Sequence, residues 1–331
     1  MIKVGILGAG TWGIALAQML SEYCNVVVWS AIDSEIDNLS RTRTHPNLKN
    51  VKLAKNVVYT KELDAVCSSE YIILAVPSVY MAEVVEKITS YIDKTKIIVN
   101  VSKGLESKSC KTMSQVIRRI LGNNFNNIVT LSGPTHAEEV VARLLTTIVA
   151  ASDNMVAAEQ VQKLFTNSIL RVYTNPDIIG VELCGSVKNI IALASGISKG
   201  LGYGDNARAA LITRGCAEIR RLGLKMGCMS QTFYGLAGIG DLIVTASSTH
   251  SRNNKAGYYI GQGMPVNEAI SKVGMVVEGI NAIKPVIDLS NKYCVDMPIV
   301  SAVNDVVYNN IKPDEIVYKL FNRTLKSEIE K

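Results

Sequence analysis

The sequence predicts an α/β N-terminal domain, with a doubly wound and mainly parallel sheet, joined to an all-α C-terminal domain. Two observations predict this fold. As far as about residue 175, short β-branched runs alternate with amphipathic stretches, which is typical of strands and helices that follow one another along the chain. After Asn175 and Pro176, the apolar residues recur with the period of a helix and few β runs remain. We therefore expect one domain over residues 1–176 and a second over residues 177–331.

The size and composition of the chain agree with this division. At 331 residues the chain is long enough for about two domains, and its 48% hydrophobic and 19% charged residues are typical of a globular protein. Its net charge of +6 is modest for this length, and the lysines and arginines are spread along the chain. We therefore expect no nucleic-acid partner, whereas a mild positive charge suits small anionic ligands.

Membrane insertion, disulfides and metal sites are not expected. We expect no apolar stretch of the ~18 residues that span a bilayer, and the sequence begins directly with its first strand, without a leader peptide. The cytoplasm is therefore the predicted location. The seven cysteines are odd in number and scattered, and the three histidines lie far apart, so neither a disulfide framework nor a metal cluster is predicted.

Eight runs are predicted to be the strands of the N-terminal sheet. Several of them are apolar throughout, which is typical of strands that helices cover on both faces. The expected strands are Ile2–Leu7, Val26–Trp29, Val57–Tyr59, Tyr71–Ala75, Lys96–Val101, Ile128–Leu131, Thr146–Ala150 and Leu170–Tyr173. In the helical domain the expected helices are Ile178–Lys199, Ala207–Met226, Asn267–Lys272, Asn281–Tyr293, Met297–Asn309 and Asp314–Asn322.

A glycine-rich turn follows the first strand and opens a helix-forming stretch over residues 14–20. Gly8 permits a tight turn, Gly10 lacks a Cβ that would block a pyrophosphate, and Gly13 lets the helix pack closely against the strand. The N-terminal amides of the helix then face the anion. With a strand before it and the strand Val26–Trp29 after it, this turn predicts a Rossmann-like unit that binds a dinucleotide.

Lys188 lies in a stretch of small and apolar residues within the first expected helix of the second domain. Burial of an unpaired ammonium group is costly, which leaves two interpretations of this side chain. In the first, the stem extends along the helix until the charge reaches water, as in most lysines. In the second, the group is partly desolvated and its pKa is low enough for proton exchange near neutral pH.

Two further polar sites follow predicted strands, where the ligands of open α/β sheets bind. Lys103 precedes a glycine after the fifth strand, and it is either a ligand contact or a plain surface lysine. After the sixth strand, Gly133 and Thr135 flank a proline in a turn that leads into an apparent helix. The amides and the Thr135 hydroxyl of this turn either bind substrate oxygens or cap the helix.

The helical domain adds three polar sites. Asp241 leads from a glycine-rich turn into an apolar run, and it is either a site residue or the N-cap of a helix. Ser251, Arg252 and Asn253 form a run of hydrogen-bond donors around one guanidinium, which suits a phosphate because charge-assisted bidentate bonds are strong. Glu278 stands between apolar residues and a glycine, so it either faces a ligand hydroxyl or points to solvent.

Eight blocks of sequence together resemble the NAD(P)-dependent glycerol-3-phosphate dehydrogenases of bacterial type. They are GAGTWG at 8–13, SKG at 102–104, SGPTHA at 132–137, GSVKNIIALASGI at 185–197, TRG at 213–215, GLAGIGDLIVT at 235–245, SRN at 251–253 and VVEG at 276–279. The resemblance covers nearly the whole chain. The blocks around Lys188 and Arg252 are much more specific than the glycine-rich turn.

The resemblance implies reversible hydride transfer between a nicotinamide cofactor, NAD or NADP, and C2 of dihydroxyacetone phosphate or sn-glycerol 3-phosphate. This reaction supplies phospholipid synthesis. The substrate is therefore expected to be a small phosphorylated three-carbon molecule, bound between the two domains. The family also implies a homodimer.

The resemblance assigns roles to individual residues as well. Lys188 matches the family's proton donor and acceptor, and Lys103 matches a residue shared by substrate and nicotinamide. The other substrate contacts that it implies are Gly133, Thr135, Asp241, Ser251, Arg252 and Asn253. Asp241 is also expected to help hold Lys188 and a substrate hydroxyl. The expected cofactor contacts include the three glycines of the turn. They are Gly8, Gly10, Thr11, Trp12, Gly13, Lys103, Ala137, Arg252, Val276 and Glu278.

One departure from the family pattern concerns the choice of cofactor. After the second strand, family members often carry an Arg or His that meets a 2′-phosphate, whereas Ala31 here offers no charge. Asp33 lies twenty residues beyond the end of the glycine-rich turn, which resembles the acidic residue that binds the free ribose in NAD enzymes. Ser30 with Arg41 or Arg43 could still accept a 2′-phosphate. We expect a weakened NADP preference, with both cofactors left open.

Two other functions stay open on the sequence. A β-hydroxyacid dehydrogenase also joins a Rossmann domain to a helical one and uses a lysine, but its carboxylate substrate does not need the donor set at 251–253. A nucleotide-binding sensor without catalysis is expected to lack a proton donor or the phosphate donors, and this chain has both. Oxidation of NADH with dihydroxyacetone phosphate, compared with a 3-oxoacid, separates the two enzymes.

Overall fold

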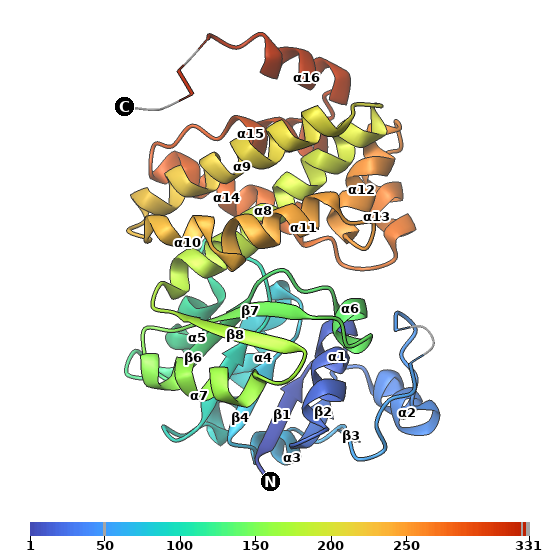
Figure 1. Cartoon of the computed structure of the whole chain (residues 1–331), viewed down its shortest axis with the longest axis vertical. Coiled ribbons are helices and arrows are strands. Elements are labelled where there is room, and N and C mark those ends of the chain that lie inside the picture. The colour runs from blue at the N-terminus through green and yellow to red at the C-terminus, as the bar shows by residue number, and fades with distance from the viewer. Residues whose placement is uncertain (49–50, 326, 329–331) are drawn as a thin grey trace.

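A computed structural model of the chain describes residues 1–48, 51–325 and 327–328. Figure 1 shows a sheet with its flanking helices in the lower half of the molecule and a bundle of helices in the upper half. The N-terminus lies below the sheet, and α16 (Pro313–Phe321) lies at the top of the view. The predicted fold, a Rossmann-like α/β part followed by an all-α part, is confirmed.

One eight-stranded sheet forms the centre of the first part, in the order β3-β2-β1-β4-β5-β6-β7-β8. Its strands are β1 (Lys3–Leu7), β2 (Asn25–Trp29), β3 (Val58–Thr60), β4 (Tyr71–Leu74), β5 (Ile97–Asn100), β6 (Ile128–Ser132), β7 (Thr146–Ala151) and β8 (Leu170–Asn175). Neighbouring strands pair in parallel, except that β6 and β7 are antiparallel. The order reverses between β1 and β4, and the carboxyl ends of strands at such a point are where ligands bind.

Helices cover both faces of the sheet. They are α1 (Thr11–Leu20), α2 (Asp33–Thr42), α3 (Leu63–Cys67), α4 (Met81–Ile88), α5 (Met113–Leu121), α6 (Ala137–Val141) and α7 (Met155–Phe165), with short 3-10 turns at Ser78–Tyr80 and Thr89–Tyr91. Successive residues of a strand point to opposite faces. Ile73 of β4 therefore packs in the core beneath α1 and α7, whereas Ile72 and Leu74 pack with α4 and α5.

The helical part surrounds one long helix, α8 (Ile178–Gly200), which runs through the middle of the bundle in Figure 1. The other elements are α9 (Asp205–Lys225), α10 (Ser230–Tyr234), the π-helical turn η3 (Leu236–Gly240), α11 (Asp241–Ser247), α12 (Arg252–Gly261), α13 (Val266–Val273), α14 (Glu278–Lys292), α15 (Pro298–Tyr308) and α16. Helices α9, α11, α12 and α14 all contact α8. Nearly every side chain of α8 is buried as a result.

The expectation that no apolar stretch is long enough to span a bilayer is wrong for α8. In length and composition this helix resembles a membrane span, but 94% of its most apolar window is buried inside the protein. A helix that other helices cover on all sides is apolar all round, because no face of it needs to meet water. Burial in the core therefore accounts for the composition of α8.

Glycines let α12 approach α8 until the two backbones touch. A Cβ added to Gly196 of α8 would lie 2.1 Å from the backbone oxygen of Asn254, and one added to Gly257 of α12 would lie 2.1 Å from that of Leu193. Side chains larger than hydrogen do not fit at these two positions. The close approach fixes the start of α12, with its run of polar donors, against the helix that carries Lys188.

The predicted elements agree with the structure in order. All eight predicted strands are present with ends within two residues of those expected, and all six predicted helices are present within three. Helices α10, α11 and α12 were not predicted, because they are short and rich in glycine or polar residues. The division at residue 176 stays a prediction, since side chains of α8 reach back to contact the sheet.

Candidate active site

Lys188 lies in the middle of α8, and its side chain is only 5% exposed. The ammonium group donates hydrogen bonds to Asp241 Oδ1 and to Thr245 Oγ1, each at 2.5 Å. Both partners lie on α11, one helical turn apart, and the Thr245 hydroxyl also contacts the backbone oxygen of Asp241 at 2.6 Å. Of the two interpretations of Lys188, the one in which its charge reaches water is therefore wrong.

Asp241 joins two lysines from different parts of the molecule. Lys103, which follows β5, donates to Asp241 Oδ2 at 2.6 Å and to the backbone oxygen of Gly133 at 3.1 Å. Asp241 does not cap α11, because Gly240 occupies the N-cap position and no side-chain cap bond is formed there. Its carboxylate instead links the loop after β5 to α8 of the helical part.

Burial and charge shift the proton affinities of this cluster. Burial lowers the pKa of Lys188 to about 7, although the charge of Asp241 acts in the opposite direction. Burial by itself raises the pKa of Asp241, but the charges of Lys103 and Lys188 outweigh it and hold that pKa below its usual value. A lysine that loses its proton near neutral pH, beside a carboxylate that stays ionised, is suited to giving and taking protons.

The loop between β6 and α6 lies beside this cluster. The Gly133 backbone oxygen accepts from Lys103 and also from the Thr135 hydroxyl at 3.2 Å. Thr135 does not cap α6, since His136 occupies the N-cap position and Ala137 begins the helix. The structure thus brings Gly133 and Thr135, the predicted substrate contacts of this loop, next to Lys103.

Ser251 and Asn253 hold the start of α12 in place. Ser251 Oγ accepts from the amide of Asn254 at 3.2 Å and so caps the helix. The Asn253 amide is held at both ends, because its nitrogen donates to Asn189 at 3.0 Å and its oxygen accepts from the amide of Gly279 at 2.8 Å. Asn189 follows Lys188 directly on α8, so this network ties the polar run to the lysine helix.

Arg252 lies with two of the predicted cofactor contacts. Its Nη1 donates to the backbone oxygen of Val276 at 3.3 Å, and burial lowers the pKa of Arg252 while the charge of Glu278 acts against that shift. Glu278 accepts from the amide and the hydroxyl of Ser78 at 3.1 and 2.7 Å. Ser78 follows β4, so this is a second contact between the sheet and the helical part.

The glycine-rich turn has the shape that a pyrophosphate requires. Gly8 has a φ of 117°, and a Cβ there would lie 2.6 Å from the backbone oxygen of Ala75. Nothing lies within 4 Å of the Cβ position of Gly10, while a Cβ on Gly13 would lie 2.2 Å from the Gly8 oxygen. Helix α1 begins directly after Gly10, at Thr11 and Trp12, without a side-chain cap. Open space and uncapped helix amides therefore meet at one point, which fits a dinucleotide.

Two partners of the predicted residues were missed from the sequence. Thr245 follows Asp241 by four residues, and this spacing on a helix was a usable signal that both face Lys188. Ser78 binds Glu278 from 200 residues away along the chain, and no local pattern announces such a contact. Tertiary packing alone brings the second pair together.

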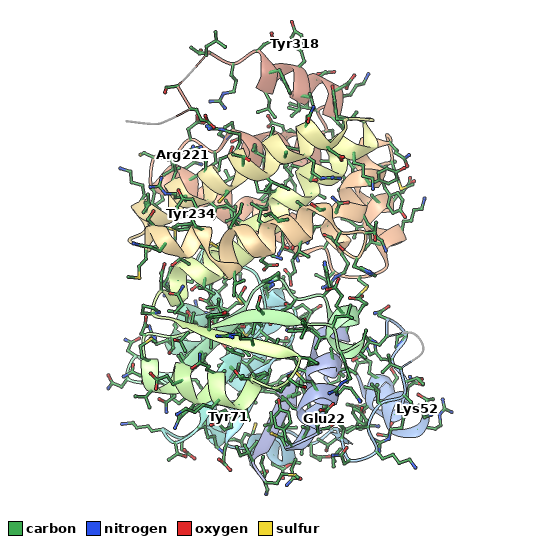
Figure 2. All side chains as sticks on the ribbon, viewed as in Figure 1. Glu22, Lys52, Tyr71, Arg221, Tyr234 and Tyr318 are labelled. Atoms are coloured by element: carbon green, nitrogen blue, oxygen red, sulfur yellow. The ribbon has the colours of Figure 1, made fainter. Side chains whose placement is uncertain are left out.

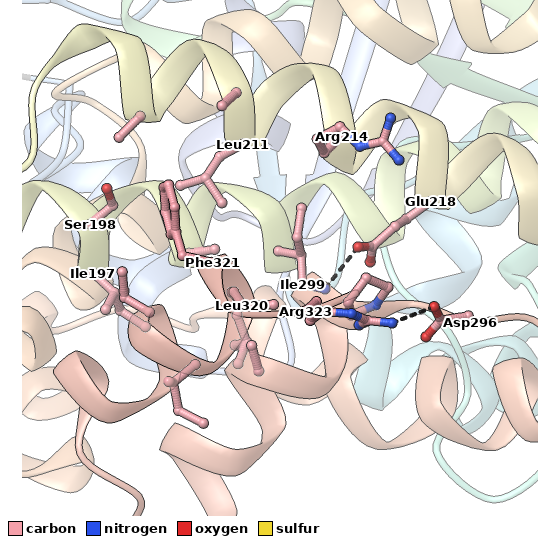
Figure 3. Close-up of a pocket in the computed structure, with 18 of the residues that line it drawn as sticks. Ile197, Ser198, Leu211, Arg214, Glu218, Asp296, Ile299, Leu320, Phe321 and Arg323 are labelled. Carbon is pink, nitrogen blue, oxygen red and sulfur yellow. Dashed lines mark hydrogen bonds and ion pairs between the residues drawn. The ribbon is translucent and has the colours of Figure 1, made fainter. Parts of the chain in front are cut away.

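Other parts of the described structure do not belong to this site. Among the residues in 1–48, 51–325 and 327–328, no group of three or more His, Cys, Asp or Glu side chains is placed to hold a metal ion. A cavity of about 1020 Å³ lies between α8, α9, α15 and α16, and Lys188 is not among the residues that line it. Figure 3 shows part of its lining. It is lined by Glu218, whose carboxylate accepts from the amides of Ile299 and Val300 at the start of α15. Burial raises the pKa of Glu218 to about 7.

Comparison with known proteins gives matches over nearly the whole chain. Residues 3–158 match a family model described as NAD-dependent glycerol-3-phosphate dehydrogenase N-terminus, and residues 177–318 match the corresponding C-terminus. Glycerol-3-phosphate dehydrogenase (NAD(P)+) 2 of Lactobacillus delbrueckii subsp. bulgaricus is 53% identical over 337 residues, with 100% of both chains covered. The Bacillus subtilis glycerol-3-phosphate dehydrogenase (NAD(P)+) is 48% identical over 334 residues, covering 100% of this chain and 97% of that one.

A solved structure agrees with these sequence matches. The crystal structure of glycerol-3-phosphate dehydrogenase from Coxiella burnetii superposes with a TM-score of 0.93 at 35% identity, covering 97% of this chain and 99% of that one. Sequence and fold thus agree along the full length of the relatives. The chain therefore belongs to the NAD-dependent glycerol-3-phosphate dehydrogenase family and is an NAD(P)-dependent oxidoreductase.

Proposed function

We propose that this chain catalyses the reversible interconversion of sn-glycerol 3-phosphate and dihydroxyacetone phosphate, with hydride transfer at C2. The observation that carries the proposal is the cluster of Lys188, Asp241 and Lys103, in which a buried lysine of lowered pKa shares a carboxylate with a second lysine. The membership of the chain in its family supplies the substrate. In this proposal the reaction provides glycerol 3-phosphate for phospholipid synthesis.

Lys188 acts as the proton donor in ketone reduction and as the acceptor in alcohol oxidation. A bound nicotinamide cofactor supplies or takes the hydride at C2. The oxygen on C2 must then gain or lose a proton, and a positioned amine with a pKa of about 7 serves both directions. Asp241 and Thr245 hold this amine in place, while Lys103 approaches the same carboxylate through its second oxygen.

Arg252, with Ser251 and Asn253, is proposed to bind the phosphate of the substrate. One guanidinium nitrogen of Arg252 donates to Val276, and a guanidinium carries further N–H donors that can bind a phosphate in bidentate fashion. The Asn253 amide has a second N–H besides the one that contacts Asn189. Gly133, Thr135 and Lys103 would then meet the oxygens at the other end of the substrate.

The loop after β2 supports a weakened preference for NADP. Ser30 donates to Glu35 at 2.6 Å, so its hydroxyl is already engaged by a carboxylate of α2. Arg43 is engaged elsewhere, because it donates to the backbone oxygen of Val57 at 2.7 Å and covers the ring of Tyr59. Ala31 is exposed and uncharged. A carboxylate accepts hydrogen bonds from ribose hydroxyls but repels a 2′-phosphate.

Kinetics with the two cofactors test this preference. We expect kcat/KM with NADH to equal or exceed that with NADPH, measured at the same concentration of dihydroxyacetone phosphate. A value at least ~10 times higher with NADPH would contradict the prediction, since that ratio corresponds to about 1.4 kcal/mol of preferential transition-state binding. Replacement of Ala31 by Arg should shift the ratio toward NADPH.

The role of Lys188 is tested by Lys188→Met, which removes the amine and keeps most of the side-chain volume. We expect turnover of dihydroxyacetone phosphate to fall by about 10²–10⁴-fold, as is typical for loss of a general acid or base. Cofactor affinity, followed by fluorescence titration, should stay the same. Lys199→Met is the matched control, because Lys199 lies exposed on the same helix. Near-normal turnover in the Lys188 variant would refute the assignment.

We also propose that the protein works in the cytoplasm as a homodimer. The described cysteines are all free thiols, which agrees with a reducing compartment. On α16, Tyr318 and Phe321 are 71% and 80% exposed, and Figure 2 shows Tyr318 at the outer edge of the molecule. Exposed aromatic side chains are frequent at protein interfaces. Sedimentation should give twice the 35.9 kDa of one chain, and a single-chain mass would contradict this.

A further inference from the structure

We propose that Ser78 is a positioning residue for cofactor and substrate, and that it acts by holding the carboxylate of Glu278. The inference rests on the proposed function, together with the expected contact between Glu278 and the cofactor. Ser78 itself lies outside the eight blocks of sequence that carry the family resemblance. It begins a 3-10 turn in the segment that follows β4, at the point where the strand order of the sheet reverses.

Ser78 binds both oxygens of the Glu278 carboxylate. Its backbone amide donates to Oε1 at 3.1 Å, and its hydroxyl donates to Oε2 at 2.7 Å. Ser78 is only 4% exposed and Glu278 is half-buried, so water competes little for these two bonds. A carboxylate oxygen can accept more than one hydrogen bond. The two bonds therefore fix the direction of the carboxylate and still leave lone pairs for a ligand.

On the sheet side, the segment that carries Ser78 packs against the glycine-rich turn. Ala75, three residues before Ser78, donates its amide to the backbone oxygen of Leu7 at 2.8 Å. A Cβ on Gly8 would lie 2.6 Å from the Ala75 oxygen and 3.0 Å from the amide nitrogen of Val76. Ser78 is thus joined by a short and closely packed segment to the turn that is expected to bind the pyrophosphate.

Gly104 leaves the space in which Ser78 and Glu278 meet. A Cβ on Gly104 would overlap the Cβ and Oγ atoms of Ser78 and would lie 3.5 Å from Glu278 Oε2. Gly104 directly follows Lys103, whose ammonium group binds Asp241. The loops after β4 and β5 therefore meet the start of α14 at one point, and that point lies next to Lys103 along the chain.

On the helical side, Glu278 is the first residue of α14, and its neighbours hold the proposed phosphate site. The amide of Gly279 donates to Asn253 Oδ1 at 2.8 Å. The backbone oxygen of Val276 accepts from Arg252 at 3.3 Å. A contact that fixes Glu278 therefore also fixes two residues that are proposed to bind the phosphate.

Docking of the two parts of the molecule does not depend on Ser78 alone. Glu182 of α8 is buried and accepts hydrogen bonds from residues of β5, α5 and β6. Lys103 with Asp241 forms a further contact between the parts. Loss of the single hydroxyl of Ser78 therefore leaves the parts docked, and its effect falls on the direction of Glu278 and on ligand binding.

The first test is Ser78→Ala, which removes the hydroxyl bond and keeps the amide bond. We expect the Kd for NADH and the KM for dihydroxyacetone phosphate to rise about fivefold or more, because a hydrogen bond to a charged group is lost. The contacts of Lys188 are unchanged, so kcat should change by less than about threefold. Ser109→Ala is the matched control, since Ser109 also donates to a carboxylate, that of Glu106, but lies exposed. Fluorescence titration and steady-state kinetics measure these values.

Glu278→Ala shows whether Ser78 acts through the carboxylate. In this background, Ser78→Ala should raise neither the Kd for NADH nor the KM any further, because the effects of two residues that form one contact are not additive. A further rise as large as the one in the wild-type background would overturn the proposal. So would an unchanged Kd and KM in Ser78→Ala, even with a lower melting temperature, since that pattern marks a purely structural role.

Gly104→Ala covers the case in which Ser78→Ala does not fold. Its methyl group would push Ser78 away from Glu278, so the Kd for NADH should rise in the same way. A Kd equal to that of the wild type would overturn the proposal. A wild type that binds NADH but does not oxidise it with dihydroxyacetone phosphate would instead contradict the proposed function, while the NADH titrations of the variants would still test Ser78.

Discussion

Lys188 owes its chemistry to the few atoms that surround it. Asp241 and Thr245 bind its ammonium group from one side of α11, and apolar side chains of the bundle exclude water around it. Without Asp241, no nearby negative charge would raise the pKa of Lys188 against the lowering by burial. The carboxylate thus sets where on the pH scale the lysine works.

This arrangement predicts the pH dependence of the reaction. Ketone reduction needs protonated Lys188, whose pKa is about 7, so kcat for dihydroxyacetone phosphate should fall as the pH rises above about 7. Oxidation of glycerol 3-phosphate needs the neutral amine and should rise over the same range. In Asp241→Asn the negative charge that raises the pKa of Lys188 is lost. The midpoints of both pH–rate profiles should therefore move to lower pH. Steady-state rates in both directions measure this, and a midpoint that does not move would contradict the assignment of Lys188.

The sequence allowed Lys188 and one of its partners to be singled out. A lysine among small and apolar residues can be recognised from its neighbours along the chain. Asp241, 53 residues further on, was recognised from the glycines before it and from the family resemblance, and it holds Lys188 as expected. Its contact with Lys103, 138 residues away, was not predicted, because that contact depends on how the whole chain folds.

At the scale of secondary structure, the contact between α8 and α12 positions the site. Gly196 and Gly257 allow the backbones to touch, and the start of α12 then lies against the lysine helix. The polar run at 251–253 would move outward if the two helices were forced apart. Packing of small residues is therefore a requirement of function here, as well as of stability.

Gly196→Ala tests this requirement. Its Cβ would lie 2.1 Å from a backbone oxygen of α12, so the helices must separate, and we expect a loss of about 1–3 kcal/mol in unfolding free energy with a higher KM for substrate. Gly204→Ala is the control, since nothing lies within 4 Å of its Cβ position and its φ of −90° suits alanine. Urea denaturation and steady-state kinetics measure both effects. Equal stability of the two variants would contradict the account.

The elements themselves were predictable to different degrees. Long helices such as α8 and α9 show many turns of apolar period, and strands such as β1 and β4 are apolar runs bounded by turns. By contrast, η3 begins directly after Gly235 and contains Gly238 and Gly240, and α11 follows these three glycines, in a stretch where intrinsic helix propensity is low. Contacts with α8 stabilise these short helices, and a propensity argument does not include such contacts.

Among the described residues, several polar contacts join the sheet and its loops to the helical part, and three of them centre on a carboxylate that is buried or half-buried. Lys103 with Asp241 and Ser78 with Glu278 are two of them. The third is Glu182 of α8, a fully buried carboxylate whose pKa is raised by burial. It accepts hydrogen bonds from residues of β5, α5 and β6, namely Asn100, Ser114 and Thr130. The site forms only when both parts are docked, so these contacts serve catalysis as well as stability.

Glu182→Ala should therefore weaken the whole protein. The substitution leaves several buried donors without an acceptor, and each unpaired donor costs about 1–3 kcal/mol, so we expect a loss of at least about 3 kcal/mol in unfolding free energy. Glu159→Ala is a suitable control, because that side chain lies exposed on α7. Thermal and urea unfolding measure the difference. A loss no larger than in the control would show that docking does not depend on this carboxylate.

The core position of α8 also matters while the protein is being made. This apolar helix ends at Gly200, but α12, which contacts it most closely, ends only at Gly261. At a synthesis rate of about 5–20 residues per second, α8 leaves the ribosome about 3 to 12 seconds before α12 is complete. During that interval its apolar surface is open to chaperones and to other nascent chains. The helix that carries Lys188 is thus also a segment of the newborn chain that stays without its cover for several seconds.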